Sequence, residues 1–291
     1  MNSLFLIVLL CTYFCCKKEE LKSEVILKEE VLQPHVQLEG KPTYIDSTSL
    51  ISFHNKVLTD FYKSTNYRTV WQSKEKREVI LDELSKSDQE GLNPEDYNVG
   101  KLFDFEKKAT TLDSLDLAKY DLLLTSSLQK YISHLTNGRL NPLKLYKNWD
   151  LKENEIDINT TVVQLLQSDS LAYKIEQLKP NHIVYKKLKK ALQLINTFPK
   201  DNFKPIKFTK TILANDSSPS VIDIKKRLIY WKELQPKDSL TPVYDEETVM
   251  ALKKFQSRHG LAIDAKIGPG TIASLNFSKN QRTQQILVNL E

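Results

Sequence analysis

Cysteine is absent from almost the whole sequence. The chain of 291 residues has Cys11, Cys15 and Cys16, and none after residue 16. The rest of the chain can therefore form no disulfide, no thiolate zinc site and no cysteine nucleophile. No two of its five histidines lie at metal-ligand spacing, and no nucleophile, base and orienting group can be assembled. We therefore predict no catalytic residues, no metal and no cofactor, and a chain that is not itself an enzyme.

Glycine is also scarce, with 7 residues, whereas leucine, lysine and glutamate are abundant. This balance favours helices over sheets. The net charge of +5 is spread along the sequence rather than gathered in one tail. The aromatic and arginine pattern of an RNA-binding fold is missing. We therefore expect a solvated, lysine-rich surface and no nucleic-acid partner.

The N-terminus carries an apolar run from Leu4 to Cys16. This run is too short to cross a bilayer as a helix but has the length of a signal-peptide core. A small residue followed by cysteine is typical of bacterial lipoprotein processing. We predict a signal peptide over 1–16 and lipidation at Cys16, with Cys15 as the alternative, disfavoured because bulky Phe14 precedes it. An ordinary secreted protein and an uncleaved membrane anchor are the other interpretations.

The following segment, residues 17–45, is charged and weakly periodic, and Pro34, Gly40 and Pro42 interrupt it. This composition predicts a tether, with a short helix at 21–32. A lipid anchor and a tether would place the folded part in the bacterial cell envelope, facing the periplasm.

Helical periodicity dominates residues 46–199, where we predict the first folded domain. The first apolar stripe starts near Ile51 and consists of Phe53, Val57, Leu58, Phe61 and Tyr62. A long helix is predicted over 115–135, with its stripe at Leu117, Tyr120, Leu124, Leu128, Tyr131 and Leu135. Gly91 and the pair Asn137-Gly138 are predicted to end helices, and Pro94 to begin one. Further helices are expected at 162–167 and 185–195.

Several motifs in this region occur together in one known family. They are Phe61-Tyr62 with Tyr67 and Trp71, then Glu90-Gly91-Leu92-Asn93-Pro94-Glu95-Asp96-Tyr97, then Asn137-Gly138-Arg139-Leu140-Asn141-Pro142, then Trp149, and finally Pro180 with Tyr185, Leu188 and Leu192. In this order they resemble the scaffold domain of large bacterial L,D-transpeptidases. We interpret the aromatic residues as core residues and expect Arg139 to form a local salt bridge.

A connector over 200–220 follows Pro199 and contains Pro205 and Pro219, as a domain boundary would. Beyond it, residues 221–278 predict three helices and an internal repeat offset by 23 residues. Leu240–Thr248 aligns with Ile263–Thr271, and each half is a loop that leads into a helix. Asp245 is expected to cap one helix, and Gly268 with Pro269 to begin the other.

The repeat resembles the small three-helix peptidoglycan-binding domain found in wall hydrolases and L,D-transpeptidases. Residues that carry the resemblance are Val221, Leu228, Thr248, Ala251, Phe255-Gln256, Gly260-Leu261, Asp264, Ile267-Gly268, Thr271 and Leu275. The family usually has glycine where this chain has Ala265. The resemblance implies peptidoglycan as a partner. We predict ligand contacts from exposed residues at the loop mouths, namely Tyr244, Gln256, Arg258, Lys266 and Thr271.

In the resembled family, a catalytic domain with a serine-histidine-glycine-cysteine run follows the binding module. Residues 279–291 resemble the lead-in to that domain, but the run itself is absent, and His259-Gly260 is followed by Leu261. The fold expected is mainly α, a helical scaffold followed by a three-helix module. Three functions remain open: a non-catalytic wall-binding lipoprotein, part of an L,D-transpeptidase whose catalytic domain is separate, or a helical envelope protein that binds another protein.

Overall fold

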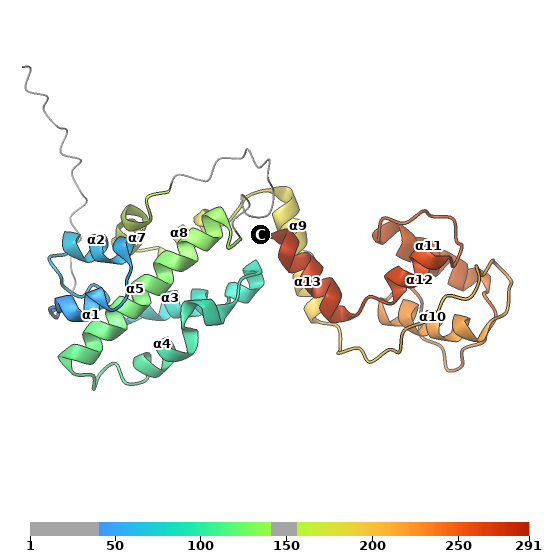
Figure 1. The fold of residues 1–291 in the computed structure, drawn as a ribbon, viewed down its shortest axis with the longest axis horizontal. Coiled ribbons are helices and arrows are strands. Elements are labelled where there is room, and N and C mark those ends of the chain that lie inside the picture. Colours follow the sequence, from blue (N-terminus) through green and yellow to red (C-terminus); the bar gives the residue numbers. More distant parts are fainter. Residues whose placement is uncertain (1–40, 141–155, 291) are drawn as a thin grey trace, which may run out of the picture. The chain divides into compact units, whose positions relative to one another are not determined.

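The computed structural model describes residues 41–140 and 156–290, all within one compact unit of the chain, Pro34–Glu291 (Figure 1). The signal peptide, Cys16, the helix at 21–32 and Trp149 lie outside the described residues. Within those residues there are twelve α-helices, two 3-10 helices and isolated β-bridges, but no strand. The predicted mainly α fold is confirmed. None of the described helices has both the length and the hydropathy to cross a membrane.

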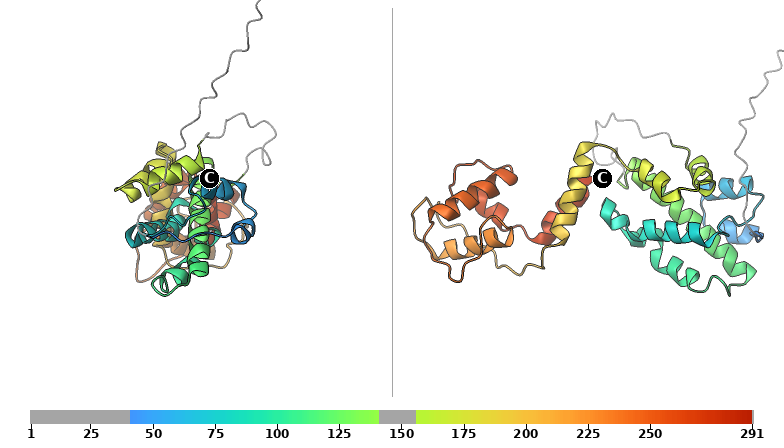
Figure 2. Two further views of the ribbon diagram at one scale, coloured as in Figure 1. Left: turned by 90° about the vertical axis from the view of Figure 1, so that its left-hand side faces the viewer. Right: turned by 180° about the vertical axis from the view of Figure 1, so that it is seen from behind.

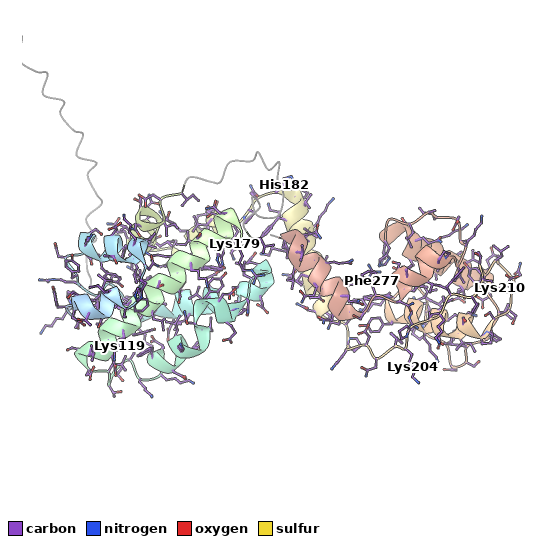
Figure 3. The ribbon with its side chains drawn as sticks, in the orientation of Figure 1. Lys119, Lys179, His182, Lys204, Lys210 and Phe277 are labelled. Carbon is purple, nitrogen blue, oxygen red and sulfur yellow. The ribbon has the colours of Figure 1, made fainter. Side chains whose placement is uncertain are left out.

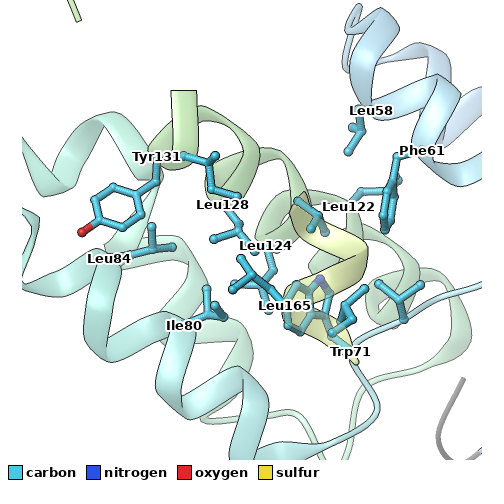
Figure 4. Close-up of a cluster of buried hydrophobic side chains, with 14 of the residues drawn as sticks. Leu58, Phe61, Trp71, Ile80, Leu84, Leu122, Leu124, Leu128, Tyr131 and Leu165 are labelled. Carbon is cyan, nitrogen blue, oxygen red and sulfur yellow. The ribbon is translucent and has the colours of Figure 1, made fainter. Parts of the chain in front are cut away.

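The first helical group surrounds one long central helix, α5. Its elements are α1 (Ser47–Ile51), α2 (Lys56–Ser64), α3 (Lys74–Ser85), η1 (Ser87–Glu90), η2 (Pro94–Tyr97), α4 (Val99–Glu106), α5 (Ser114–Asn137), α7 (Ile158–Leu166) and α8 (Leu171–Leu178). Helix α5 contacts α1, α2, α3, α4, α7 and α8, so its apolar residues pack against several neighbouring helices. Figure 4 shows Ile80 and Leu84 of α3 facing Leu124 and Leu128 of α5. Trp71 and Tyr97 are buried, as predicted.

The ends of α5 follow from local chemistry. Asp113 caps its N-terminus by accepting a hydrogen bond from the backbone N–H of Asp116. Gly138 ends it at a φ of 78°, a conformation that glycine adopts without strain. The neighbouring Arg139 forms an ion pair with Asp96 at 3.5 Å. The predicted helix end and the predicted salt bridge are both confirmed.

A buried carboxylate lies in the middle of this core. The Asp121 side chain accepts hydrogen bonds from the Tyr62 hydroxyl (2.5 Å) and from the backbone N–H groups of Val70 (2.9 Å) and Trp71 (2.8 Å). Thr125 completes the cluster by binding the Tyr62 hydroxyl and the Trp71 indole. Burial raises the pKa of Asp121 to about 7, although the hydrogen bonds favour its charged form.

One expectation for this region was wrong in detail, and one helix was missed. The stripe from Phe53 to Tyr62 is not one helix, because α1 ends at Ile51 and Asn55 caps a new helix at Lys56. Val57 consequently points outward and is 41% exposed. Helix α8 was not predicted, although its Leu171 and Ile175 are buried.

Helices α9 (Ile183–Asn196) and α13 (Lys279–Leu290) lie side by side, although more than eighty residues separate them in sequence (Figure 2). Tyr185, Leu192, Ile195 and Leu290 form their shared apolar cluster. The backbone N–H of Lys279 donates to the Asp201 carboxylate at 2.9 Å, so the chain leaves α9 and returns to nearly the same point. The sequence suggested only a lead-in to another domain for residues 279–291. In the structure, Lys279–Leu290 is a helix that packs on α9.

The part of the sequence that lies between α9 and α13 forms a three-helix bundle. Its helices are α10 (Pro219–Tyr230), α11 (Glu246–Arg258) and α12 (Pro269–Leu275). The connector runs along this bundle, with Lys204 and Lys210 labelled on it in Figure 3. Ile206 and Ile212 of the connector are buried in the bundle core. Asn276 holds the connector, because its side chain exchanges two hydrogen bonds with the backbone of Ile206 (2.8 and 2.9 Å). The connector is thus part of the bundle rather than a free linker.

Candidate functional site

The two halves of the internal repeat occupy equivalent positions in the bundle. Tyr244 and Ile267, which are 23 residues apart, are both fully buried. Each pairs with the connector through its backbone: Tyr244 N–H donates to Asp216 at 2.8 Å, and Ile267 N–H donates to Ile212 at 3.1 Å. The repeat inferred from sequence therefore corresponds to a repeated structural unit.

Each half then begins a helix as predicted. Asp245 caps α11 by accepting from the backbone N–H of Thr248, and Gly268 with Pro269 begins α12. Asp245 also forms an ion pair of 2.6 Å with the buried amine of Lys225. Burial alone would raise the pKa of Asp245, but the hydrogen bonds from Lys225 and Thr248 lower it to about 2.

Gln256 organises the loop of the second half. Its Nε2 donates to the Lys266 carbonyl (3.2 Å) and lies within hydrogen-bond distance of Asp264 Oδ1 (3.1 Å) and Thr271 Oγ1 (3.3 Å). Its Oε1 accepts from the Ala265 N–H at 3.0 Å. Asp264 also accepts from the Lys266 N–H, which confirms its predicted role in holding its own loop. One buried amide thus sets the shape of loop 260–268.

Replacement of Gln256 by leucine should destabilise the bundle by about 3 kcal/mol, because buried loop groups lose their partners while the volume hardly changes. Hydrogen exchange of the α11 amides measures the free energy of opening of the bundle itself. Exposed Gln235 provides the matched control, and we expect Gln235→Leu to change stability by less than about 0.5 kcal/mol. Equal effects of the two variants would contradict this role for Gln256.

The structure divides the five predicted ligand contacts into two groups. Arg258 and Lys266 are exposed, as expected. Tyr244, Gln256 and Thr271 are 0%, 1% and 6% exposed, so their predicted exposure was wrong. Four of the five nevertheless meet around one loop, because Gln256 joins Lys266 and Thr271, and the Tyr244 hydroxyl donates to the Ala265 carbonyl at 2.8 Å. The buried residues support the loop that presents Lys266.

Ala265 has a φ of +58°, in the left-handed region that a side chain with a Cβ adopts at a cost. Glycine is therefore the better residue at this position, where the family resemblance also expects it. Ala265→Gly should stabilise the bundle by up to about 1 kcal/mol, as strain relief exceeds the added freedom of the unfolded chain.

The same exchange at Ala273, an exposed position within α12, is the matched control. There, Ala273→Gly should destabilise by about 1 kcal/mol, since glycine weakens a helix interior. Thermal unfolding of both variants tests the opposite signs. A loss of stability at position 265 would show that the left-handed backbone is not a source of strain.

Arg258 contacts a different loop, which sequence reasoning missed. Its guanidinium lies 3.1 Å from Glu233 Oε1, and the Glu233 side chain is only 2% exposed. Burial raises the pKa of Glu233, while Arg258 and Lys254 oppose that shift. Glu233 is the third residue after α10, and no motif in the sequence distinguishes it from the many surface glutamates.

No group of three or more histidine, cysteine, aspartate or glutamate side chains able to hold a metal occurs in residues 41–140 and 156–290. The polar groups of the bundle are suited instead to hydrogen bonding and ion pairing. An exposed loop with a lysine, an exposed arginine, and a buried amide with two buried hydroxyls that support the loop can bind a ligand without covalent chemistry.

Comparison with known families agrees with this arrangement. Residues 56–192 match the family described as scaffold domain, and residues 217–275 match the peptidoglycan binding domain. No curated protein matches the chain. The chain thus contains an L,D-transpeptidase-type scaffold domain and a peptidoglycan-binding domain, as the resemblance implied. These domains support a peptidoglycan-binding role and an association with the cell envelope.

Proposed function

We propose that this protein binds peptidoglycan non-covalently through the α10–α12 bundle and that the scaffold holds the bundle in place. The match of residues 217–275 to a peptidoglycan-binding domain carries this proposal. Lys266 and Arg258 are the proposed direct contacts, because both are exposed cations and stem peptides carry carboxylates. Tyr244, Gln256 and Thr271 act indirectly, by holding loop 260–268.

Amide chemical shifts of the 15N-labelled chain, titrated with soluble muropeptides, test this function. We expect the largest shift changes in loop 260–268 and at the C-terminal end of α11. Helices α2 to α5 supply the internal control, since they belong to the scaffold core. Shift changes that do not include loop 260–268, or none at all, would overturn the proposal.

The same proposal includes the setting of the protein. We infer lipidation at Cys16, a tether over 17–45 and a position in the bacterial envelope facing the periplasm. The apolar run from Leu4 to Cys16 supports this inference. A Cys16→Ser variant should leave the membrane fraction of cells, whereas a Cys11→Ser variant should stay in it. Unchanged membrane association of Cys16→Ser would contradict lipidation at this residue.

A second function is favoured by the scaffold match over residues 56–192. Under this alternative, the protein works with an L,D-transpeptidase catalytic domain that is supplied separately, and this chain contributes only substrate binding. Copurification of such a catalytic domain with the tagged chain from cells would support the alternative. Binding to peptidoglycan with no copurifying transpeptidase would favour the non-catalytic protein.

A further inference from the structure

A cavity of about 390 Å³ lies beside the bundle, bounded by residues of α9, α13 and the ends of α10 and α11. Its apolar wall includes Ile195, Phe198, Trp231 and Ile286. The rings of Phe198 and Trp231 pack against each other, with their centroids 5.5 Å apart. None of the residues discussed above for loop 260–268 lines this cavity. Arg258 and Glu233, in contrast, both do.

Glu233 occupies a position where a polar side chain is unexpected. Helix α10 ends in a Schellman motif, in which the Lys232 N–H donates to Ile229 and the Glu233 N–H donates to Leu228. The residue at the place of Glu233 usually makes an apolar contact with the preceding helix. Here the residue is a glutamate, 8% exposed as a whole residue, and its Oε2 is buried with no hydrogen-bond partner. A carboxylate oxygen left in this state costs stability, and a ligand that donates to it would offset that cost.

A second unsatisfied group lines the same cavity. Arg282 anchors to Ser274 through Nη2, which donates to the Ser274 carbonyl at 2.8 Å. Its guanidinium packs over Phe277, 5.2 Å from the ring centroid, and its Nε is buried without an acceptor. The residues that line the cavity therefore provide an apolar wall and, buried beneath its surface, one acceptor without a donor and one donor without an acceptor.

Arg258 controls access to Glu233. Its side chain is 64% exposed, and within the described chain its ion pair is with Glu233. The arginine side chain can move aside through solvent, but its departure is costly unless Glu233 gains another partner. If Arg258 leaves, a buried carboxylate needs a new cation in its place.

We propose that this cavity binds an aliphatic chain that ends in an ammonium and a carboxylate on one carbon atom. The ligand ammonium takes the place of Arg258 beside Glu233 and donates to Oε2. The ligand carboxylate then accepts from the displaced Arg258 and from Arg282 Nε. This exchange keeps every charge paired, and the bound end group is neutral overall, so little net charge is desolvated. The aliphatic chain packs on Trp231 and Phe198.

This end group occurs in the diamino acid of peptidoglycan stem peptides, and also in free amino acids. The inference rests on the proposed function for its biological source, but the chemistry of the cavity stands apart from loop 260–268. A neutral sugar is a poorer fit, because it offers no cation to Glu233, and the Trp231 ring already contacts Phe198 and Arg282.

Calorimetric titration of the full chain, kept soluble in mild detergent, tests the inference with three probes. They are a stem tripeptide that ends in meso-diaminopimelate, the same peptide acetylated on the side-chain amine, and free meso-diaminopimelate. We expect acetylation to weaken binding at least 10-fold. Similar affinity for the free diamino acid would show that the end group alone is recognised, whereas preference for the tripeptide would identify the stem as the source.

Substitutions separate the two ends of the ligand. Glu233→Gln should weaken binding of the tripeptide at least 10-fold, and its loss of a buried charge does not threaten folding. Arg258→Gln removes a partner of the ligand carboxylate but also the cation that the ligand ammonium displaces, and it should leave the effect of acetylation intact. The control is Glu247→Gln, in an exposed pair with Lys237 on the same bundle, which should bind as the unmodified chain does.

Equal affinity for the acetylated and free amine, or unchanged binding in Glu233→Gln, would overturn the inference. The proposed function fails by a different observation, which is that no muropeptide shifts loop 260–268. If muropeptides shift loop 260–268 but none of the three probes binds in the cavity, the proposed function stands and the inference about the cavity is wrong.

Discussion

Replacing Glu90 by alanine should lower the free energy of unfolding by about 3–5 kcal/mol, the usual cost of removing one partner from a buried ionic cluster. Glu90 is 6% exposed. Its Oε1 lies 2.7 Å from Lys189 Nζ and 3.0 Å from Lys179 Nζ, and its Oε2 accepts from the Tyr185 hydroxyl at 2.6 Å. Alanine would remove the acceptor of Lys189 and of the Tyr185 phenol, whereas Lys179 would keep its ion pairs with Glu83 and Glu176. Urea unfolding followed by circular dichroism measures the effect.

An exposed ion pair serves as the control for Glu90. Asp82 and Lys86 pair at 2.6 Å, but both side chains are about half exposed. We expect Asp82→Ala to change the free energy of unfolding by less than about 0.5 kcal/mol. Because Glu90 joins η1 to α9, its loss should also raise hydrogen exchange in α9. If Glu90→Ala and Asp82→Ala cost the same, the buried cluster contributes nothing specific.

Stability should fall as the pH rises from about 4 to 8, by up to about 4 kcal/mol from Asp121 alone. The pKa of Asp121 is about 7 in the folded chain, against an ordinary value of 3.8. Between these two values the folded state keeps the proton and the unfolded state loses it. The contribution of Asp121 to the free energy of unfolding is therefore fully present below pH 3.8, and it is lost as the pH rises through 7. Thermal unfolding midpoints at a series of pH values measure this slope.

Asp121→Asn isolates this contribution, because asparagine cannot titrate but still accepts from Val70 and Trp71. The contribution of Asp121 is given by the difference between the pH dependence of the unmodified chain and that of Asp121→Asn. The absolute midpoint of either protein does not give it. Glu90 contributes a slope of opposite sign only near the lower end of this window, where its carboxyl titrates in the unfolded chain, and this slope is common to both proteins. Burial alone would raise the pKa of Glu90, but Lys189, Tyr185 and Lys179 lower it, so it titrates below 4.5. Parallel pH profiles for the two proteins would show that Asp121 is ionised when folded.

Helix positions that depend on local chemistry were predictable from the sequence. Asn137-Gly138 ends α5, and Asp245 and Pro269 begin α11 and α12, because caps and backbone preferences act over a few residues. The repeat of loops was likewise visible from spacing alone. The separation between α1 and α2 was not predicted. The apolar spacing continues across it, and only the capping residue Asn55 marks the start of the new helix.

Long-range partners could not be predicted in the same way. Glu90 was quoted only as part of a turn motif, yet its lysines lie 89 and 99 residues further along the chain. The pairing of α9 with α13 and the burial of Ile206 depend on how the chain returns after the bundle. Among the candidate site residues, polarity suggested exposure for Gln256 and Thr271. Their burial follows from the hydrogen bonds that they form, which no local pattern reveals.

The central claim is that the α10–α12 bundle attaches this protein to peptidoglycan, and excision of the bundle tests it most directly. Truncation after Ser218 would also remove α13 and expose the apolar side of α9. The closeness of Asp201 and Lys279 permits a cleaner variant, in which a short Gly-Ser linker replaces residues 202–278.

Both proteins would be sedimented with purified peptidoglycan sacculi, with circular dichroism to show that the excised variant keeps its helices. We predict that the full chain sediments with the sacculi and that the excised variant stays in the supernatant. Equal sedimentation of the two proteins, or failure of the full chain to sediment, would contradict the central claim.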